Sequence, residues 1–278
     1  MNKADNNTTS RAAAWFGALA GQALAGYPDS LLVADTRFND QAVRFIAVVP
    51  DPNNRFVRAR NGEVGLTEGW QLARAVQEVI AADQNSAVKT PIIAIVDVPS
   101  QAYGRREEAY GIHLALAAAA GAYAAARLGG HPVVALIVGK AMSGAFLAHG
   151  YQANRIVAFD DPEVMVHAMG KASAARITLR SVEALTALAE SIAPMAYDIK
   201  NFASLGLLSA SLAVQHPDTP DQIGLDAVRR CLQQMLVSIA EEVQHDLSGR
   251  LDAPHRQASK RARELLRQQW NRELPMAR

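Results

Sequence analysis

The sequence predicts an α/β fold in which helices bury a sheet. Two continuous apolar runs, Ile92 to Val98 and Val133 to Val138, have the length and composition of strands that are buried on both faces. Between them, Glu107 to Leu128 is long and alanine-rich, as a helix would be. Because strands separated by helices favour a sheet that is covered by helices, this alternation predicts the fold class.

The N-terminal part adds one helix and two strands to this plan. Residues 1–10 are polar and are predicted to be disordered, whereas Arg11 to Ala25 is predicted to be a short helix. Two strand-like runs follow, Leu31 to Asp35 and Val43 to Val49. The polar residues 37–40 between them predict a turn.

A further helix is predicted over Glu68 to Ala81, with Thr67 as its N-cap. Apolar side chains recur along it at helical spacing, so one face should be buried. The residues of that face are Trp70, Ala73, Val76, Val79 and Ile80.

The second half of the chain continues the alternation. Small residues at 139–144 predict a tight turn after the strand that ends at Val138, and Phe146 to Gln152 is predicted to be a helix. Further strands are expected at Arg155 to Phe159 and Val164 to His167. Later helices are expected from Ser181 to Ile192 and from Asp226 to Val243. We predict one domain over 11–246, followed by a basic helix or tail over 247–278.

Composition excludes several functions. The 278 residues carry a formal net charge of +1 and are 50% hydrophobic, so the chain has no basic field for nucleic acid and no polybasic membrane patch. No apolar run is long enough to span a bilayer, and no secretory signal is evident. A single cysteine, Cys231, fits a reducing cytoplasm. The sequence has no His-x-x-x-His or cysteine pair at metal-ligand spacing, and we expect no metal site.

The predicted turn after Val138 could supply an oxyanion hole. Amides between a strand and a helix lack partners within the helix, so they can face a negatively charged oxygen. The candidate backbone donors are Met142, Ser143, Gly144 and Ala145, with the Ser143 hydroxyl as an orienting group. Alternatively, these small residues only allow close helix packing.

Several stretches of the sequence together resemble a known family. These are Glu68-Gly69-Trp70, Thr90 to Pro99, Ala102 to Gly104 with Glu107-Glu108, and His131 to Val134 with Gly139 to Gly144. In this order they resemble the biotin-side half of acyl-CoA carboxyltransferases. They are most similar to the gamma subunits of biotin-independent malonate decarboxylases, over roughly residues 60 to 215. The resemblance implies a crotonase-like fold of repeated ββα units with peripheral helices.

The resemblance also implies a reaction and partners. Such a subunit decarboxylates malonyl-S-acyl carrier protein to acetyl-S-acyl carrier protein and CO₂, together with a homologous beta subunit in a hetero-oligomer. No cofactor is expected on this chain itself, because the substrate hangs on the phosphopantetheine-type group of the carrier protein. Side chains at Ala141-Met142 and Ala145 would hinder a biotin ring, which is consistent with an enzyme that needs no biotin.

Substrate contacts are expected from the loop that follows Val98. Arg105 or Arg106 could bind the malonyl carboxylate, and Tyr103 and Gly104 lie in the same loop. The two arginines could equally be surface residues near the acidic residues that follow them. Lys140 could also pair with the carboxylate.

Three other functions stay open. The segments of Ser143 and His167 are similar to the serine and histidine segments of Clp-type peptidases, in which Ser143 would be the nucleophile and His167 its base. The chain could also be a biotin-dependent acyl-CoA carboxyltransferase subunit, or a scaffold subunit without catalytic groups. A third orienting group, which a hydrolase would require, is not identifiable in the sequence.

Overall fold

A seven-stranded sheet organises the part of the chain that the structure describes, in the order β1-β2-β3-β4-β5-β7, with β6 paired to β4. This computed structural model describes residues 10–38, 40–242, 245–251 and 253–273. The β1–β2 pair is antiparallel, and the other pairs are parallel. The strands are β1 Leu31–Phe38, β2 Gln41–Val48, β3 Ile92–Val98, β4 Val133–Met142, β5 Arg155–Phe159, β6 Met165–His167 and β7 Ala210–Leu212.

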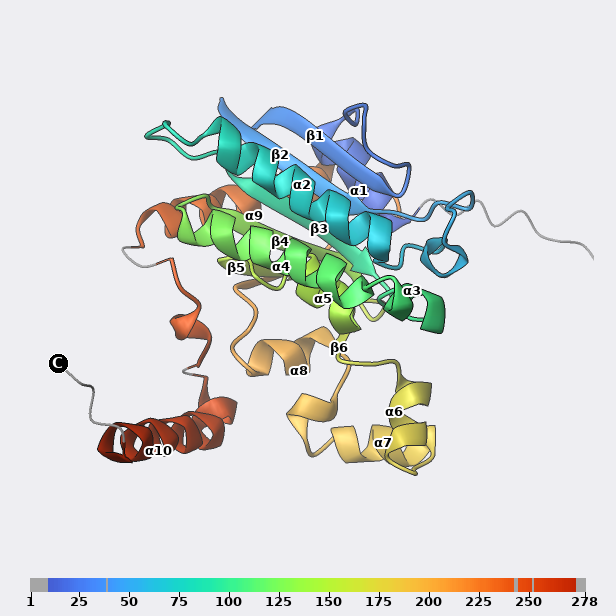
Figure 1. Ribbon diagram of the computed structural model, residues 1–278, viewed down its shortest axis with the longest axis vertical. Helices are drawn as coiled ribbons and strands as arrows, with labels where there is room; N and C mark the ends of the chain where they lie inside the picture. The colour runs from blue at the N-terminus through green and yellow to red at the C-terminus, as the bar shows by residue number, and fades with distance from the viewer. Residues whose placement is uncertain (1–9, 39, 243–244, 252, 274–278) are drawn as a thin grey trace, which may run out of the picture.

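Helices cover both faces of this sheet (Figure 1). Helices α2 (Leu66–Ala82) and α4 (Ile112–Leu128) lie across one face, whereas α1 (Arg11–Ala20) and α9 (Gln222–Ala240) lie behind the sheet. The ring of Trp15 in α1 meets Phe159 edge to face, at 4.8 Å between centroids. The α/β fold with a sheet buried by helices is therefore confirmed.

The remaining helices lie outside these layers. Helices α6, α7 and α8 form a lobe below the sheet, and α10 stands apart at the lower left of Figure 1. No helix within the described residues is both long and apolar enough to cross a bilayer. The bounds are α3 Arg105–Ala109, α5 Ser143–Ala148, α6 Lys171–Ile177, α7 Val182–Ala189, α8 Ile199–Ser204 and α10 Gln257–Glu273.

Helix α2 begins at Leu66, two residues earlier than predicted. Its N-cap is Gly65 rather than Thr67, because the buried carboxylate of Glu68 reaches back and accepts the Gly65 N–H at 3.0 Å. The predicted apolar face is also partly wrong, since Trp70 is 51% exposed and Leu72 is buried instead. Gly69 faces α4: a Cβ there would lie 2.8 Å from the backbone carbon of Ala115, so the close approach of the two helices at this point requires glycine.

The long predicted helix over 107–128 is two helices. Gly111 has φ +81, a left-handed conformation that favours glycine, and it separates α3 from α4. The break turns the chain, so that α4 runs back along α2 while α3 stays near the end of β3. The break was not predicted, because helix-forming residues stand on both sides of Gly111.

Strand β4 runs through the predicted turn. It continues to Met142 because β6 pairs with residues 140–142, and α5 then starts at Ser143 rather than Phe146 and ends at Ala148. The β3–β4 register shifts between Val96 and Val98, where β4 has the extra residues, and the Asp97 carboxylate there accepts the Lys140 N–H at 3.0 Å. A Cβ at Gly139 would lie 2.2 Å from that carboxylate oxygen, so glycine is required within the strand.

A buried histidine links three elements beneath the end of α5. His149 Nε2 lies 3.0 Å from the Ile95 carbonyl oxygen, and Nδ1 lies 3.0 Å from the Tyr123 hydroxyl. The carbonyl can only accept, so Nε2 carries the proton and Nδ1 accepts from Tyr123. Burial lowers the pKa of His149 to about 4, which keeps the ring neutral.

Most other element predictions hold in kind and differ at the ends. The strands at 92–98 and 155–159 have the predicted bounds, whereas β1 extends to Phe38. Ser181 caps α7 by accepting the Ala184 N–H, but that helix ends at Ala189. Cys231 is a buried free thiol.

The described residues form one main hydrophobic core, which lies within the predicted domain over 11–246. Predicted disorder at residues 1–10 falls mainly outside the described residues, and Ser10 caps α1. One hydrophobic core contains buried residues from Ala12 to Ile239, and α10 contributes none to it. The boundary at 246/247 stays a prediction.

Candidate active site

The junction of β4 and α5 places a strained serine beside a cavity. Ser143 has φ +56, a left-handed conformation that is uncommon for a residue with a Cβ. Its hydroxyl donates to the Ala168 carbonyl oxygen at 2.6 Å, which ties this junction to the chain just after β6. The hydroxyl is therefore engaged with backbone.

The next amide already binds an oxygen. The Gly144 N–H donates to Oε1 of Gln101 at 3.0 Å, and Gln101 lies in the loop that follows β3. That loop is held by the segment before α2, because Val64 pairs with Gln101 and the Ala102 N–H donates to the Val64 carbonyl at 2.8 Å. Gly144 is thus a donor pointed at an acceptor that comes from a different ββα unit.

An apolar cavity of about 400 Å³ lies against this junction. Ser143 and Gly144 line it, whereas Met142 and Ala145 are buried and do not. Its other walls come from α5, β6, α8 and the segments around them: Phe146, Leu147, Tyr151, Val166, His167, Ala168, Ala193, Pro194, Ala196, Phe202, Leu205 and Leu207. Of the four predicted donor residues, Ser143 and Gly144 line the cavity.

His167 lines the same cavity but is bonded elsewhere. Its Nδ1 lies 3.1 Å from the Met169 carbonyl oxygen, and its ring stacks on Tyr197 at 3.9 Å between centroids. Burial lowers the pKa of His167, so the neutral form is favoured. Within the described residues, no hydrogen bond joins Ser143 to His167 and no carboxylate contacts His167.

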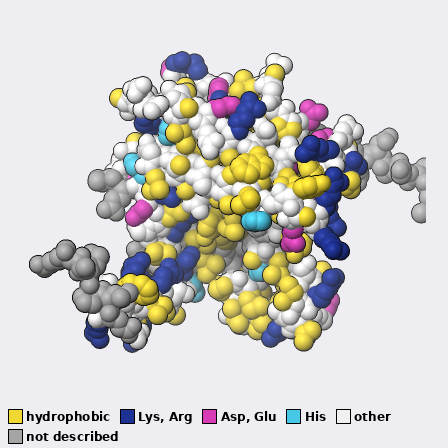
Figure 2. Space-filling view, viewed as in Figure 1, with side chains coloured by type: hydrophobic (Ala, Val, Ile, Leu, Met, Phe, Trp, Pro, Cys, Tyr) yellow, Lys and Arg dark blue, Asp and Glu magenta, His cyan; other side chains and the backbone are white. Residues whose placement is uncertain are grey.

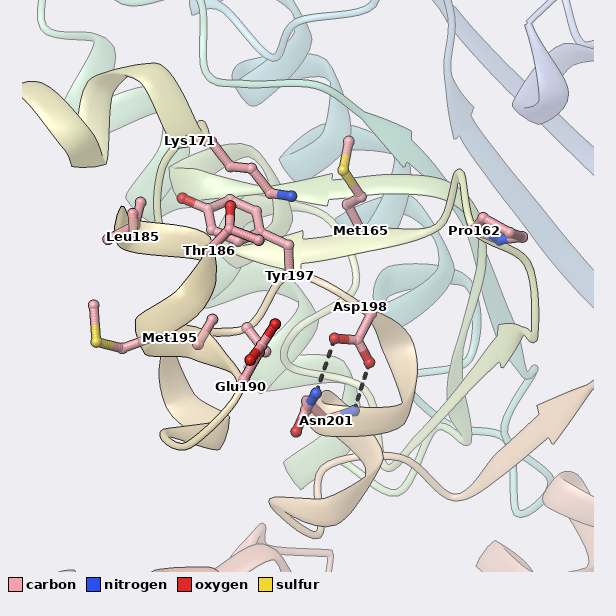
Figure 3. A pocket seen from close by; sticks show the side chains of 12 residues that line it. Pro162, Met165, Lys171, Leu185, Thr186, Glu190, Met195, Tyr197, Asp198 and Asn201 are labelled. Atoms are coloured by element: carbon pink, nitrogen blue, oxygen red, sulfur yellow. Dashed lines mark hydrogen bonds between the residues drawn. The ribbon is translucent and has the colours of Figure 1, made fainter. Parts of the chain in front are cut away.

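Tyr197 lines a second cavity of about 250 Å³ (Figure 3), and Ala196 lines both cavities. The Tyr197 hydroxyl donates to the Met169 carbonyl oxygen at 2.7 Å, and the Lys171 ammonium lies 5.3 Å from the Tyr197 ring centroid. On the other wall, the Asp198 carboxylate accepts from the N–H and the side-chain amide of Asn201, as the dashed lines show. The Tyr197 hydroxyl, Asp198 and Asn201 thus bond within the wall itself.

The predicted substrate loop faces elsewhere. Tyr103 is 60% exposed, and Gly104 caps α3 against the side chains of Arg58 and Glu107. Arg105 is exposed, and the Arg106 guanidinium lies over Phe56 and lines a cavity of about 850 Å³ that shares no lining residue with the Gly144 cavity.

The side chain of Lys140 is exposed on β4 and does not line the Gly144 cavity. Within the described residues, no carboxylate pairs with it and no group of three His, Cys, Asp or Glu side chains could hold a metal ion.

Two parts of this site escaped sequence reasoning. Gln101 is an ordinary polar loop residue, and only the pairing of its loop with Val64 brings it to Gly144. The apolar walls around Phe202 and Leu207 come from a segment more than 50 residues away from Gly144 in sequence. No local pattern encodes either contact.

Comparison with known proteins assigns the chain to a family. The family model described as malonate decarboxylase gamma subunit matches residues 59–270. The chain belongs to the malonate decarboxylase gamma subunit family. It is 61% identical to a chain in the crystal structure of a Pseudomonas malonate decarboxylase hetero-tetramer in complex with coenzyme A, with a TM-score of 0.91, covering 94% of this chain and 100% of that chain.

Two further comparisons agree with this assignment. A chain of the Pseudomonas malonate decarboxylase MdcD-MdcE hetero-dimer is 58% identical, with a TM-score of 0.87 and coverage of 94% and 99%. The malonyl-S-ACP:biotin-protein carboxyltransferase MADD of Malonomonas rubra is 41% identical over 141 residues, which are 50% of this chain and 48% of that protein. This chain therefore spans about half of that relative.

The fold extends to more distant carboxyltransferases. The transcarboxylase 12S core matches with a TM-score of 0.62 at 21% identity, covering 82% of this chain and 41% of that chain. At this identity the likeness concerns the fold alone. The predicted crotonase-like carboxyltransferase fold is confirmed, and so is the predicted resemblance to malonate decarboxylase gamma subunits.

Proposed function

We propose that this gamma subunit acts with a homologous beta subunit on a malonyl thioester carried by an acyl carrier protein, and releases CO₂. One observation carries the proposal: the Gly144 N–H already holds an oxygen, Gln101 Oε1 at 3.0 Å, beside an apolar cavity. Further support comes from relatives, of which one is named for malonyl-S-ACP and another for an MdcD-MdcE hetero-dimer.

The reaction breaks one carbon–carbon bond. The malonyl carboxylate leaves as CO₂, and the bonding electron pair stays on the thioester as an enolate, whose charge lies mainly on oxygen. A proton then adds to carbon and gives the acetyl thioester. A fixed N–H donor lowers the barrier because its bond to the oxygen strengthens as negative charge develops.

The surroundings of Gly144 suit this step. In the bound state, a thioester or carboxylate oxygen would replace Oε1 of Gln101 on the Gly144 N–H, and the bond from the Ser143 hydroxyl to the Ala168 carbonyl would hold the junction in place. Apolar walls such as Phe146 and Phe202 exclude water, which otherwise stabilises the ionised carboxylate more than the dispersed charge of the transition state. Lys140 and Tyr103, both exposed, are proposed to contact the substrate from outside the cavity.

A pair of variants tests the donor. Gly144→Pro removes the N–H in the first turn of α5, where proline is tolerated, and Gly144→Ala keeps the N–H. A Cβ at this position meets its nearest atom at 3.5 Å, an ordinary contact, so the alanine variant should fold. In the reconstituted complex, the proline variant should release CO₂ about 100- to 1,000-fold more slowly, and the alanine variant at close to the normal rate.

Assembly with the beta subunit, measured by size-exclusion chromatography, must be intact for both variants. Full activity of an assembled Gly144→Pro complex would refute the donor role. Release of CO₂ by the beta subunit alone would instead indicate that this chain is a scaffold.

A serine hydrolase is the second candidate, because Ser143 is left-handed at a strand-to-helix junction and shares its cavity with His167. The Ser143 bond to the Ala168 carbonyl disfavours it, since an activated serine donates to its base. A fluorophosphonate probe decides: covalent labelling of wild type but not of Ser143→Ala would support the hydrolase.

The reaction should need no biotin, and the protein should reside in the cytoplasm. We propose that no biotin takes part, as the resemblance to biotin-independent decarboxylases implies. The expectation that Met142 and Ala145 hinder a biotin ring does not support this, because both residues are buried and do not line the cavity. Added biotinyl carrier should leave CO₂ release unchanged. A cytoplasmic location is proposed from the buried free thiol of Cys231, and fractionation of cells would test it.

A further inference from the structure

An arginine-rich surface with exposed apolar side chains lies beside α3. We call it the arginine–aromatic surface, and all of its members are exposed. In Figure 2, Lys and Arg side chains gather at the right edge of the view, over α3 and the segment that precedes α2. Its members are Arg55, Val57, Arg58, Trp70, Tyr103, Arg105, Arg106 and Tyr110.

Ring contacts make this a continuous surface. The guanidinium groups of Arg55 and Arg106 lie over the same ring, that of Phe56, at 4.6 and 5.6 Å. Arg106 also lies 5.7 Å from the Tyr110 ring, and these side chains line the cavity of about 850 Å³ together with Trp70. Stacked guanidinium groups keep their N–H edges available to an anion.

The arginines outnumber the acids exposed among them. Within the described residues, no carboxylate forms an ion pair with Arg55, Arg105 or Arg106. Arg58 lies 3.9 Å from Glu107, which is buried.

The nearby acids are few. Asp51 lines the cavity and accepts the Asn53 N–H at 2.9 Å, and Glu108 is exposed on α3. An anionic partner therefore meets more positive than negative charge here.

Hydrogen bonds hold one side of this surface to α2, and a short loop connects its other side to the candidate site. The buried Glu68 carboxylate accepts from the Ser30 hydroxyl at 2.6 Å and from the Asn54 amide at 2.7 Å, and the Asn54 side chain in turn accepts the Phe56 N–H. On the other side, only two residues separate Gln101, which binds the Gly144 amide, from Gly104 at the start of α3.

We propose that the arginine–aromatic surface is where the phosphopantetheine-bearing carrier protein docks, with guanidinium groups facing its phosphodiester. The inference rests on the proposed function, because a thioester on such an arm enters the site with an anionic phosphodiester at the carrier end. Arginine binds phosphate oxygens through paired N–H donors, and the exposed aromatic side chains offer apolar contact to the carrier.

Two substrates separate docking from chemistry. Malonyl-carrier protein has the phosphodiester and the protein, whereas malonyl-pantetheine has neither. In the reconstituted complex, Arg55→Gln should raise KM for malonyl-carrier protein about threefold, and Arg55→Gln with Arg106→Gln about tenfold. For Arg55→Gln, kcat/KM with malonyl-pantetheine should not change.

Matched substitutions sharpen this test. Glu108→Gln removes an acid from the same surface and should lower KM for the carrier about twofold. Arg230→Gln, an exposed arginine on α9, should have no effect. Affinity of the complex for fluorescently labelled carrier, measured by anisotropy, should change in the same order whether or not the complex is active.

The outcomes distinguish this proposal from the proposed function. Normal carrier affinity in the double arginine variant overturns the docking site, even if CO₂ release from malonyl-pantetheine is intact. Loss of beta-subunit assembly in Arg55→Gln would also overturn it, because the surface would then be a subunit interface. A wild-type complex that binds carrier through these arginines but decarboxylates neither thioester would refute the proposed function and leave docking in place.

Discussion

The Gly144 cavity and the arginine–aromatic surface differ in polarity and exposure, and we propose different roles for them. The cavity has mostly apolar walls, and the polar residues at its junction, Ser143 and Gly144, are held by hydrogen bonds to Ala168 and Gln101. The surface consists of exposed guanidinium groups on aromatic rings. Function in the cavity should therefore depend on geometry and little on ionic strength, whereas function at the surface should depend on charge and tolerate small shifts.

The largest of these effects should come from a charge placed on the Gly144 N–H, next to the cavity. Gln101→Glu would put a carboxylate on the Gly144 N–H, and this charge-assisted hydrogen bond is stronger than the present one. The negative charge of the introduced carboxylate would also repel the substrate carboxylate. Decarboxylation of malonyl-pantetheine should fall about 100-fold or more, equivalent to about 3 kcal/mol. Steady-state CO₂ release measures it, and Gln101→Ala, which removes the competitor, should be at least as active as wild type.

The stability of the fold around the cavity should depend on pH, because burial lowers the pKa of both His149 and His167. Burial lowers the pKa of His149 to about 4, and the unfolded chain takes up the proton near the ordinary histidine pKa of about 6.5. This contribution is complete above that value and is lost as the pH falls toward 4, about 3 kcal/mol in all. His167 should add to the loss in the same direction.

Urea unfolding of the chain at pH 7.0, 6.0 and 5.0 measures this loss. A His149→Gln variant should show a shallower decline than wild type between these values. An identical slope in both would mean that His149 is not the titrating group.

A smaller effect is expected from one hydroxyl group beneath the site. Tyr123→Phe leaves His149 Nδ1 buried without a donor, so the free energy of unfolding should fall by about 1–3 kcal/mol. Thermal denaturation measures it. Tyr110→Phe, at an exposed ring of the arginine–aromatic surface, is the matched control and should leave the melting temperature unchanged.

The smallest effect concerns ionic strength. Between about 0.05 and 0.3 M salt, KM for malonyl-carrier protein should rise a few-fold, because exposed charges are screened. KM for malonyl-pantetheine should stay constant over the same range. Equal salt dependence of both substrates would remove the distinction between the two regions.

Sequence reasoning reached the elements and the family but not the contacts between units. The buried strands β3 and β5 were predictable because their apolar runs are unbroken, and their ends matched. The end of β4 was not, since its last residues are held by pairing with β6, a three-residue strand from later in the chain. The N-cap of α2 was predicted wrongly for a related reason. The Glu68 carboxylate, which accepts the N-cap N–H, is held by hydrogen bonds from Ser30 and Asn54, which are distant in sequence.

Some residues of the site were likewise predictable from the sequence, and others were not. Ser143 and Gly144 were predictable as small residues after a strand, whereas Met142 and Ala145 lie beneath the cavity. Gln101 required the three-dimensional structure, because a loop from another unit brings it to Gly144. Arg105 and Arg106 were predicted as residues that bind anions, and the structure places them away from the Gly144 cavity.

The hydrogen bond from the Gly144 N–H to Gln101 means that this donor is already occupied in the chain without a ligand. A ligand oxygen that binds the Gly144 N–H must displace the carboxamide oxygen of Gln101. Because Gln101 belongs to the same chain, its effective concentration does not fall when the protein is diluted. The affinity measured for a ligand at this position is then an exchange free energy, and inhibitors should be ranked by how much better an acceptor they are than a primary carboxamide.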